Sequence, residues 1–325
     1  MDLPVPIGGH LEGCRIGFDA GGSDRKVSAV VDGETVYSEE VVWFPKITAD
    51  PDYHYEGIVS ALKSAASHMP RVDAVGVSSA GVYINNRTMR ASLFLQVPKD
   101  LFDTKVKDIY IRAIRDTFGD VPYAVANDGD VSALAGAMGL GKGKMMGLAM
   151  GTSEAVGYVD ADKNVLGWIN ELAFAPVDLQ PTAMQDEWSL DFGVGCKYFS
   201  QDAVIKLCPA AGIELDESLS LAEKLKAVQK LMEADDPRAQ AIFETIGAYF
   251  GYTVVLYSQF YDLDYIMLMG RVMSGKGGDT ILKVTNDILA AEYPELAAKC
   301  CVTLPDEKMR RVGQAVAAAS LPQVK

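Results

Sequence analysis

Three segments of the chain place glycine beside polar residues, and each could hold the phosphate groups of a ligand. They are residues 19–23 (DAGGS), 151–157 (GTSEAVG) and 270–278 (GRVMSGKGG). Glycine lets the backbone approach a ligand closely and turn its N–H groups toward it, so such segments bind phosphate oxygens without a basic side chain. The alternative for any single segment is a plain hairpin turn. The presence of three such segments favours a cradle for a nucleotide.

The elements around the first segment form a mixed unit. Residues 14–20 and 26–31 are apolar runs on either side of the glycines, and residues 34–44 alternate well enough to be the next strand of an antiparallel meander. Apolar residues at helical spacing predict a helix over 54–68, which leads into a buried strand over 72–81 that ends in small residues. Small-residue loops at one edge of an open α/β sheet are the usual place for a ligand.

The second half of the chain repeats this plan. A helix is expected over 102–118, a strand over 121–128 that ends on Asn127-Asp128, and an alanine-rich helix that begins at the acid. Residues 145–160 then return to strand, glycine turn and strand, a weak internal repeat that a duplicated two-lobed fold would leave. Beyond it, residues 188–233 are predicted to be mostly helical, a helix starts at Pro237, and a final helix begins near 305 and can return to the first lobe.

Composition excludes several classes of function. The formal charge of −14 and the isoelectric point near 4.7, with no Lys/Arg run, disfavour nucleic acid and anionic membranes as partners. The N-terminus has no secretion signal and no segment has the ~18 apolar residues that span a bilayer, so we expect a cytoplasmic protein. The five cysteines form no CxxC pair and only three histidines accompany them, which predicts reduced thiols and no zinc.

The glycine segments carry a resemblance to a known superfamily. FDAGGS resembles the first phosphate loop of the actin, hexokinase and heat-shock-protein superfamily, LAMGTSEAVG the second, and IMLMGRVMSG the adenosine loop. VPYAVANDGDVSALAGAMGLGKG is similar to the strand, Asn-Asp and alanine-rich helix of the ROK (repressor, open reading frame, kinase) family of sugar kinases. The resemblance covers nearly the whole chain. It implies an α/β fold of the two-lobed actin-like ATPase (ribonuclease H-like) type, with mixed sheets and flanking helices.

The resemblance also implies roles for individual residues. Asp128 matches the general base that accepts the proton of the sugar hydroxyl, and Asn127 and Glu171 match sugar contacts. Asp19 matches the acid that holds Mg2+ through water. The remaining candidates are two substrate contacts at the end of strand 72–81, Ser79 and Gly81, and a nucleotide-binding set of Gly21, Gly22, Ser23, Gly151, Thr152, Gly270 and Arg271. Each acid also has a structural alternative: a helix cap at Asp128, a turn cap at Asp19 and a solvated loop acid at Glu171.

Departures from the family pattern affect the zinc site and the substrate. Phe174 stands at the position of the family's zinc-binding His, and of its cysteine cluster only Cys196 is present, so ATP and Mg2+ are expected and zinc is not. Tyr198 replaces a further sugar-binding Glu, which leaves a more apolar wall and points to a polyol or modified sugar rather than glucose. In the second phosphate loop, Glu154 would weaken triphosphate binding unless it faced Mg2+ or solvent.

Two functional hypotheses remain after these comparisons. The first is an ATP-dependent kinase whose lobes, 1–122 with 305–325 and 123–304, close over a sugar or polyol; dimers are common in the family, so a homodimer is one expected assembly. The second is a non-catalytic sensor of a sugar or nucleotide on the same scaffold. Too few residues precede the first strand for a helix-turn-helix, which argues against a repressor. A dinucleotide-dependent oxidoreductase is disfavoured because no GxGxxG follows that strand.

Overall fold

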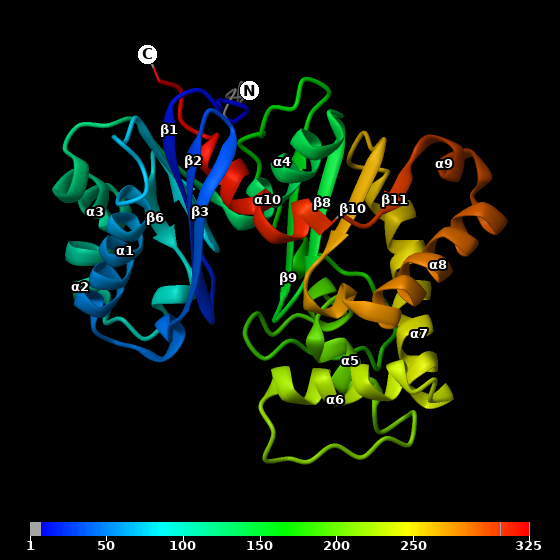
Figure 1. The fold of residues 1–325 in the computed structure, drawn as a ribbon. Coiled ribbons are helices and arrows are strands. Elements are labelled where there is room, and N and C mark those ends of the chain that lie inside the picture. Colours follow the sequence, from blue (N-terminus) through cyan, green and yellow to red (C-terminus); the bar gives the residue numbers. More distant parts are fainter. Residues whose placement is uncertain (1–7, 306, 325) are drawn as a thin grey trace. The chain divides into compact units, whose positions relative to one another are not determined.

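The computed structural model describes residues 8–305 and 307–324 of the 325-residue chain. The chain forms two compact units (Figure 1). Unit 1 comprises Met1–Lys142, Gly157–Ile169 and Asp306–Lys325, and unit 2 comprises Gly143–Val156 and Asn170–Pro305. The two functional lobes expected from the sequence, 1–122 with 305–325 and 123–304, stay a prediction.

Unit 1 is built on a five-stranded mixed sheet in the order β3-β2-β1-β4-β7. Its strands are β1 (Cys14–Ala20), β2 (Asp24–Val31), β3 (Glu34–Val42), β4 (Ala74–Ser79) and β7 (Tyr123–Asn127). β1, β2 and β3 pair in antiparallel fashion, which confirms the predicted meander, whereas β4 runs parallel to both β1 and β7. A separate hairpin of β5 (Val82–Ile84) and β6 (Arg87–Arg90) follows β4.

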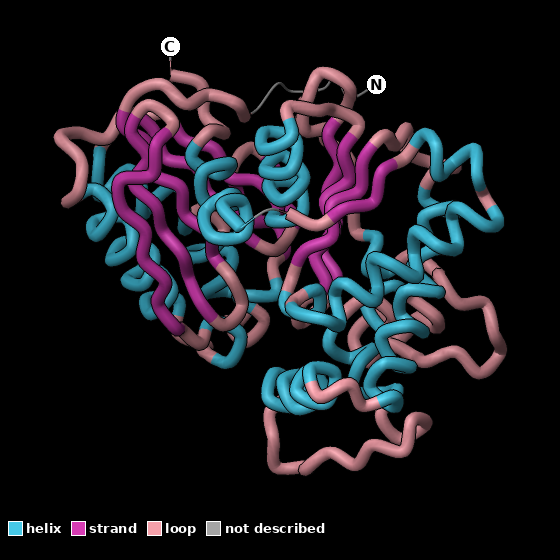
Figure 2. The backbone as a smooth tube through the Cα atoms, turned by 45° about the vertical axis from the view of Figure 1, so that its right-hand side comes forward, coloured by secondary structure: helices cyan, strands magenta, loops and turns pink. Residues whose placement is uncertain are grey.

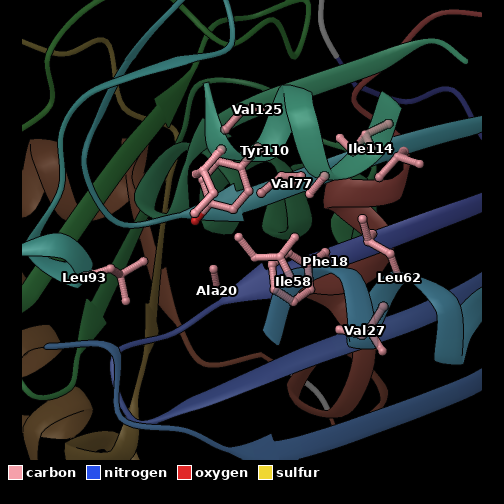
Figure 3. Close-up of a cluster of buried hydrophobic side chains, with 14 of the residues drawn as sticks. Phe18, Ala20, Val27, Ile58, Leu62, Val77, Leu93, Tyr110, Ile114 and Val125 are labelled. Carbon is pink, nitrogen blue, oxygen red and sulfur yellow. The ribbon is translucent and has the colours of Figure 1, made fainter. Parts of the chain in front are cut away.

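Helices cover both faces of this sheet (Figures 1 and 2). α1 (Pro51–Ala66) and α3 (Ile109–Phe118) cover one face, and α10 (Glu307–Ala319) packs on the other face and against α4 (Asp128–Leu140). Because alternate side chains of a strand point to opposite faces, Ile16 and Phe18 enter the core beneath α1, where Figure 3 shows Phe18 beside Ile58. Gly17 faces α10, and a Cβ there would overlap the carbonyl oxygen of Ala315. The close approach of the C-terminal helix therefore requires glycine in β1.

Local signals account for the helix ends in unit 1. α1 begins after Asp50, whose side chain accepts a hydrogen bond from the N–H of Asp52 at 2.9 Å. The helix predicted over 102–118 is interrupted: α2 (Lys99–Leu101) leads into a π-helical turn, η3 (Phe102–Val106), and α3 starts only at Ile109. The predicted strand over 121–128 and the helix that begins at Asp128 are both confirmed as β7 and α4.

The second sheet, whose strands lie mostly in unit 2, has four strands in the order β11-β10-β8-β9. The strands are β8 (Met145–Met150), β9 (Glu154–Val159), β10 (Tyr265–Met269) and β11 (Cys301–Thr303), and β10 is parallel to both β8 and β11. The helices are α5 (Gln201–Leu207), α6 (Leu221–Glu233), α7 (Pro237–Tyr257), α8 (Gly275–Glu292) and α9 (Pro294–Lys299). α7 and α8 pack closely, and the hydroxyl of Thr285 donates to the carbonyl of Gly247 at 3.1 Å.

The prediction of mostly helical structure over 188–233 is wrong for its first part. Residues 188–200 contain only a short 3-10 turn, η5 (Gly195–Lys197), and they pair through isolated β-bridges between Pro176 and Val194 and between Gln185 and Phe192. Long-range pairing overrides local apolar spacing here. No helix within the described residues is both long enough and apolar enough to cross a membrane.

Candidate functional site

The carboxyl ends of three neighbouring strands bring the predicted acids of unit 1 together. β1, β4 and β7 run parallel, and their register sets Asp19 opposite Ser78 and Ser79 opposite Asn127. Asp128, the first residue of α4, follows Asn127 directly. Ligand sites of open α/β sheets lie at this edge, beyond the carboxyl ends of the strands. The structure therefore gathers Asp19, Asn127 and Asp128 at one edge of one sheet.

Asp19 is held in place by a serine hydroxyl, and its surroundings disfavour the charged form of its carboxyl group. Ser78 Oγ donates to Asp19 Oδ1 at 2.9 Å. Burial raises the pKa of Asp19 to about 7; the Ser78 hydrogen bond opposes this shift, and the charges of Asp128 and Asp24 add to it. A carboxylate that burial and like charges disfavour is stabilised by a cation, and its oxygen donors suit Mg2+. The residues present thus fit the predicted magnesium role.

Asp128 lies at the N-terminus of α4, but the helix cap is its neighbour. The Oδ1 of Asn127 accepts a hydrogen bond from the N–H of Gly129 at 2.8 Å, and Oδ1 of Asp128 shares that N–H at 3.0 Å. Burial raises the pKa of Asp128, whereas the Gly129 N–H and the positive charge of Lys46 lower it. The capping function expected as the alternative for Asp128 falls mainly to Asn127.

The small residues at the end of β4 and just after it hold neighbouring side chains in place. The carbonyl of Gly81 accepts a hydrogen bond from Nδ2 of Asn127 at 2.9 Å. Ser79 is fully buried, and its hydroxyl hydrogen-bonds with those of Tyr110 at 2.8 Å and Tyr83 at 2.7 Å. Ser79 and Gly81 therefore orient neighbouring parts of unit 1, and their contact with a substrate stays a prediction. One amide hydrogen and one lone pair of Asn127 remain for a ligand.

Gln314 is a site residue that the sequence analysis missed. It lies on α10, almost two hundred positions from Asp128, and its Nε2 lies 3.2 Å from Ser78 Oγ and 3.4 Å from the carbonyl oxygen of Asp128. A hydrogen-bond chain thus runs from Gln314 through Ser78 to Asp19. The only local signal is an amide among small residues in GQAVAAAS, which by itself could as well face solvent.

Residues 21–23 of the first glycine segment are held by Trp43, the residue that follows β3. Trp43 is almost fully buried; its Nε1 donates to the carbonyl of Gly21 at 2.7 Å and its N–H to that of Ser23 at 3.2 Å. Ser23 Oγ donates to Asp24 at 3.2 Å. These contacts fix the turn between β1 and β2 beside Asp19.

Unit 2 brings the other two glycine segments side by side. β8 and β10 are parallel neighbours, with Met269 opposite Ala149, so the turns that follow them meet at one edge. Gly270 has φ of +95°, and a Cβ there would overlap the backbone of Met150. Gly151 N–H donates to the carbonyl of Ser153 at 3.0 Å. Thr152 lies in this turn, next to the segment that carries Gly270.

Two further candidates of unit 2 are exposed. Arg271 has an exposed side chain, and its carbonyl accepts a hydrogen bond from Gln229 Nε2 at 2.9 Å. Glu171 is exposed at the start of the 3-10 turn η4 (Leu172–Phe174). Phe174 lies against the ring of Trp188, with 5.2 Å between centroids. The apolar wall that we expect beside the substrate stays a prediction.

Glu154 avoids the conflict that its position in the second phosphate loop suggested. Its side chain is buried inside unit 2, with Oε1 3.4 Å from the hydroxyl of Tyr257. Among the residues that the structure describes, Oε2 has no hydrogen-bond partner, and it lies against Gly195, where a Cβ would overlap it. Burial raises the pKa of Glu154 to about 8, so the group is mostly protonated at neutral pH.

A buried lysine holds the segment that resembles the family's zinc loop. Nζ of Lys197 forms ion pairs with Glu187, with Asp202 at 2.9 Å and with Asp186 at 3.6 Å. Burial lowers the pKa of Lys197, but the hydrogen bonds to Glu187 and Asp202 outweigh it and leave the pKa raised. Cys196 Sγ lies 3.5 Å from Asp186. Within the described residues, no group of three or more His, Cys, Asp or Glu side chains could hold a metal ion.

Comparison with known proteins identifies the fold. No family model matches the sequence, and no protein of curated function matches it. The structure is similar to a ROK hexokinase from Thermus thermophilus (17% identity, TM-score 0.69, 94% of this chain and 96% of that chain). It is also similar to a ROK family glucokinase from Streptomyces griseus in complex with glucose and AMPPNP (18%, 0.71, 94% and 98%).

A third similar structure is a ROK family transcriptional regulator, a homolog of the E. coli MLC protein (13% identity, TM-score 0.68, 96% of this chain and 79% of that chain). The predicted fold class is confirmed: the chain has the mixed α/β, actin-like ATPase fold of ROK proteins. The resemblance to the ROK family is thereby confirmed at the level of the fold.

Proposed function

We propose that the protein is a divergent ROK family kinase that transfers the terminal phosphoryl group of ATP to a hydroxyl of a sugar or sugar-like molecule. The observation that carries the proposal is the shared environment of Asp19 and Asp128 at the edge of the unit 1 sheet, where the charge of one raises the pKa of the other. ROK kinases with the same fold support the activity class.

The chemistry assigns a different task to each acid. Asp128 accepts the proton of the acceptor hydroxyl as its oxygen attacks the γ-phosphorus; the new O–P bond forms while the bond to the bridging oxygen breaks, and ADP leaves with the electron pair. Burial raises the pKa of Asp128 above the ordinary value of an aspartate, which makes the carboxylate a better base. Asp19, oriented by Ser78, would hold Mg2+, which neutralises charge on the phosphates.

Side chains of unit 2 indicate which class of acceptor molecule the enzyme would use. Phe174 and Trp188 lie together in unit 2, and Tyr198 donates its hydroxyl to Asp178 at 2.6 Å instead of presenting a carboxylate. The rings of Phe174 and Trp188 suit a sugar with an apolar substituent better than an unmodified hexose, whereas Tyr198 is buried.

The test is a panel of sugars and polyols with MgATP, followed by ADP release, for the wild type, Asp128→Asn and the surface control Asp120→Asn. We expect one acceptor class to stimulate ADP release and Asp128→Asn to lower kcat by about 100-fold or more without loss of nucleotide binding. Asp120 is exposed, so its variant should match the wild type. Full activity of Asp128→Asn would reject the assigned base.

The similarity to a transcriptional regulator keeps the sensor hypothesis as the second candidate. A sensor would bind a sugar or nucleotide, as measured by calorimetry, yet release no ADP with any acceptor. The same panel therefore separates the two functions.

A further inference from the structure

One lysine of unit 1 lies beside the first glycine turn and is not part of the mechanism above. Lys46 belongs to the 3-10 turn η1 (Pro45–Ile47) that follows β3. Its Cε and Nζ lie 2.5 and 3.0 Å from the point where a Cβ on Gly22 would stand. The ammonium group is thus packed over the middle of the turn between β1 and β2, at a place that only glycine leaves free.

The position of Lys46 is fixed by its neighbours on both sides. Trp43 ties the start of the segment to the glycine turn through its hydrogen bonds to Gly21 and Ser23. The carbonyl of Pro45 lies 3.0 Å from Nε2 of the buried His54 on α1, and Thr48 Oγ1 bonds the carbonyl of Phe44 at 2.6 Å. The segment is therefore a built part of the site rather than a free loop.

Lys46 differs from the other basic side chains near the turn in the partners that they have. Lys26 forms an ion pair with Glu40 at 3.7 Å, and Arg25 lies over the ring of Trp43 at 5.9 Å. Among the side chains that the structure describes, no carboxylate lies within ion-pair distance of Lys46, although the chain has a net charge of −14. The positive charge of Lys46 acts to lower the pKa of Asp128, the proposed base. A partly buried ammonium at this place can interact with an anion bound at the turn.

We propose that Lys46 binds the terminal phosphate of the phosphoryl donor and supplies the positive charge that the glycine turn lacks. The inference rests on the proposed kinase function and adds a residue to it. A lysine is a compact charge that suits a phosphate oxygen, and Lys46 both packs on the glycine turn and lies within electrostatic reach of Asp128, the two groups that the transferred phosphoryl group would approach. If Lys46 served only to stabilise the Asp128 carboxylate, its loss would affect turnover but would not discriminate between nucleotides.

The experiment compares the affinities for MgATP and MgADP in calorimetry without acceptor, together with ADP release in its presence. The variants are Lys46→Met, which keeps the aliphatic stem over Gly22, Lys46→Arg, which keeps the charge, and Lys63→Met, an exposed control on α1. We expect Lys46→Met to weaken MgATP binding about tenfold to a hundredfold, as for a lost hydrogen bond to a charged group, and MgADP binding less than about twofold. We expect kcat to fall about 100-fold and Lys46→Arg to retain most of both properties.

Several results would overturn the inference. Equal weakening of MgATP and MgADP, or unchanged affinity for MgATP in Lys46→Met, would remove Lys46 from the terminal phosphate while the kinase function stands. If the wild type binds neither nucleotide and releases no ADP, the proposed function fails first and the inference fails with it. Circular dichroism of each variant separates these outcomes from misfolding, and Lys46→Arg serves as the second probe if Lys46→Met does not fold.

Discussion

The buried carboxyl group of Glu154 should make the stability of unit 2 depend on pH. In the folded protein its pKa is about 8, against 4.5 for an ordinary glutamate, because burial disfavours the charged form. Between these two values the unfolded chain has lost a proton that the folded chain keeps. The free energy of unfolding therefore decreases as pH rises through this window.

The expected size follows from the two pKa values. Each pH unit between them costs up to about 1.4 kcal/mol, so the contribution of this one group falls by about 3 kcal/mol between pH 5 and pH 8. Glu154→Gln removes the titration and keeps the shape and one oxygen for the Tyr257 hydroxyl. We expect the variant to equal the wild type near pH 5 and to exceed it at pH 8.

The assay is urea unfolding followed by circular dichroism at pH 5 and pH 8. The difference between wild type and variant at each pH cancels the contributions of all other groups. Burial raises the pKa of Cys196, which Glu154 influences, to about 12, and burial raises the pKa of Tyr257 well above its usual value of 10, so neither group titrates in this window. Glu214→Gln, at an exposed position, is the control. A wild-type-minus-variant difference that is the same at both pH values would refute the reasoning.

Two other perturbations test the supports of the site. Gln314→Leu breaks the hydrogen-bond chain to Ser78 and Asp19, and it should raise the Mg2+ concentration for half-maximal ADP release about tenfold, as outer-shell changes do. An unchanged magnesium titration would dismiss Gln314 as a positioning residue. Lys197→Met leaves the buried carboxylate of Asp186 without its cation and should lower the free energy of unfolding by about 3 kcal/mol in a urea titration, whereas Lys299→Met, at an exposed pair, should change it by less than about 1 kcal/mol. Equal effects of the two lysine variants would contradict the structural role of Lys197.

Local sequence signals determined much of this fold. Apolar runs broken by Asp-Gly and Gly-Gly marked the β1–β2–β3 meander, and Asp236 before Pro237 marked the start of α7. These features depend on neighbouring residues, so a single chain reveals them. The order of the glycine segments, together with the strand, Asn-Asp and alanine-rich helix over 121–143, was sufficient to identify the ROK fold.

The irregular segment 188–200 was not predictable in the same way. Its apolar spacing resembles that of a helix, but its conformation depends on β-bridges to residues 176 and 185 and on the ion pairs of Lys197. Such contacts between loop segments leave no periodic pattern in the sequence and override weak helix propensity.

The sequence by itself indicated which acids and glycines belong to the proposed site, because their types and order follow from strand ends and turns. Only the tertiary structure decided which partners they have: Gln314 returns on α10 to bond Ser78, Lys46 packs over Gly22, and Glu154 turns into the interior of unit 2. These contacts join residues far apart in the chain. Their existence depends on packing and burial, which no local sequence pattern specifies.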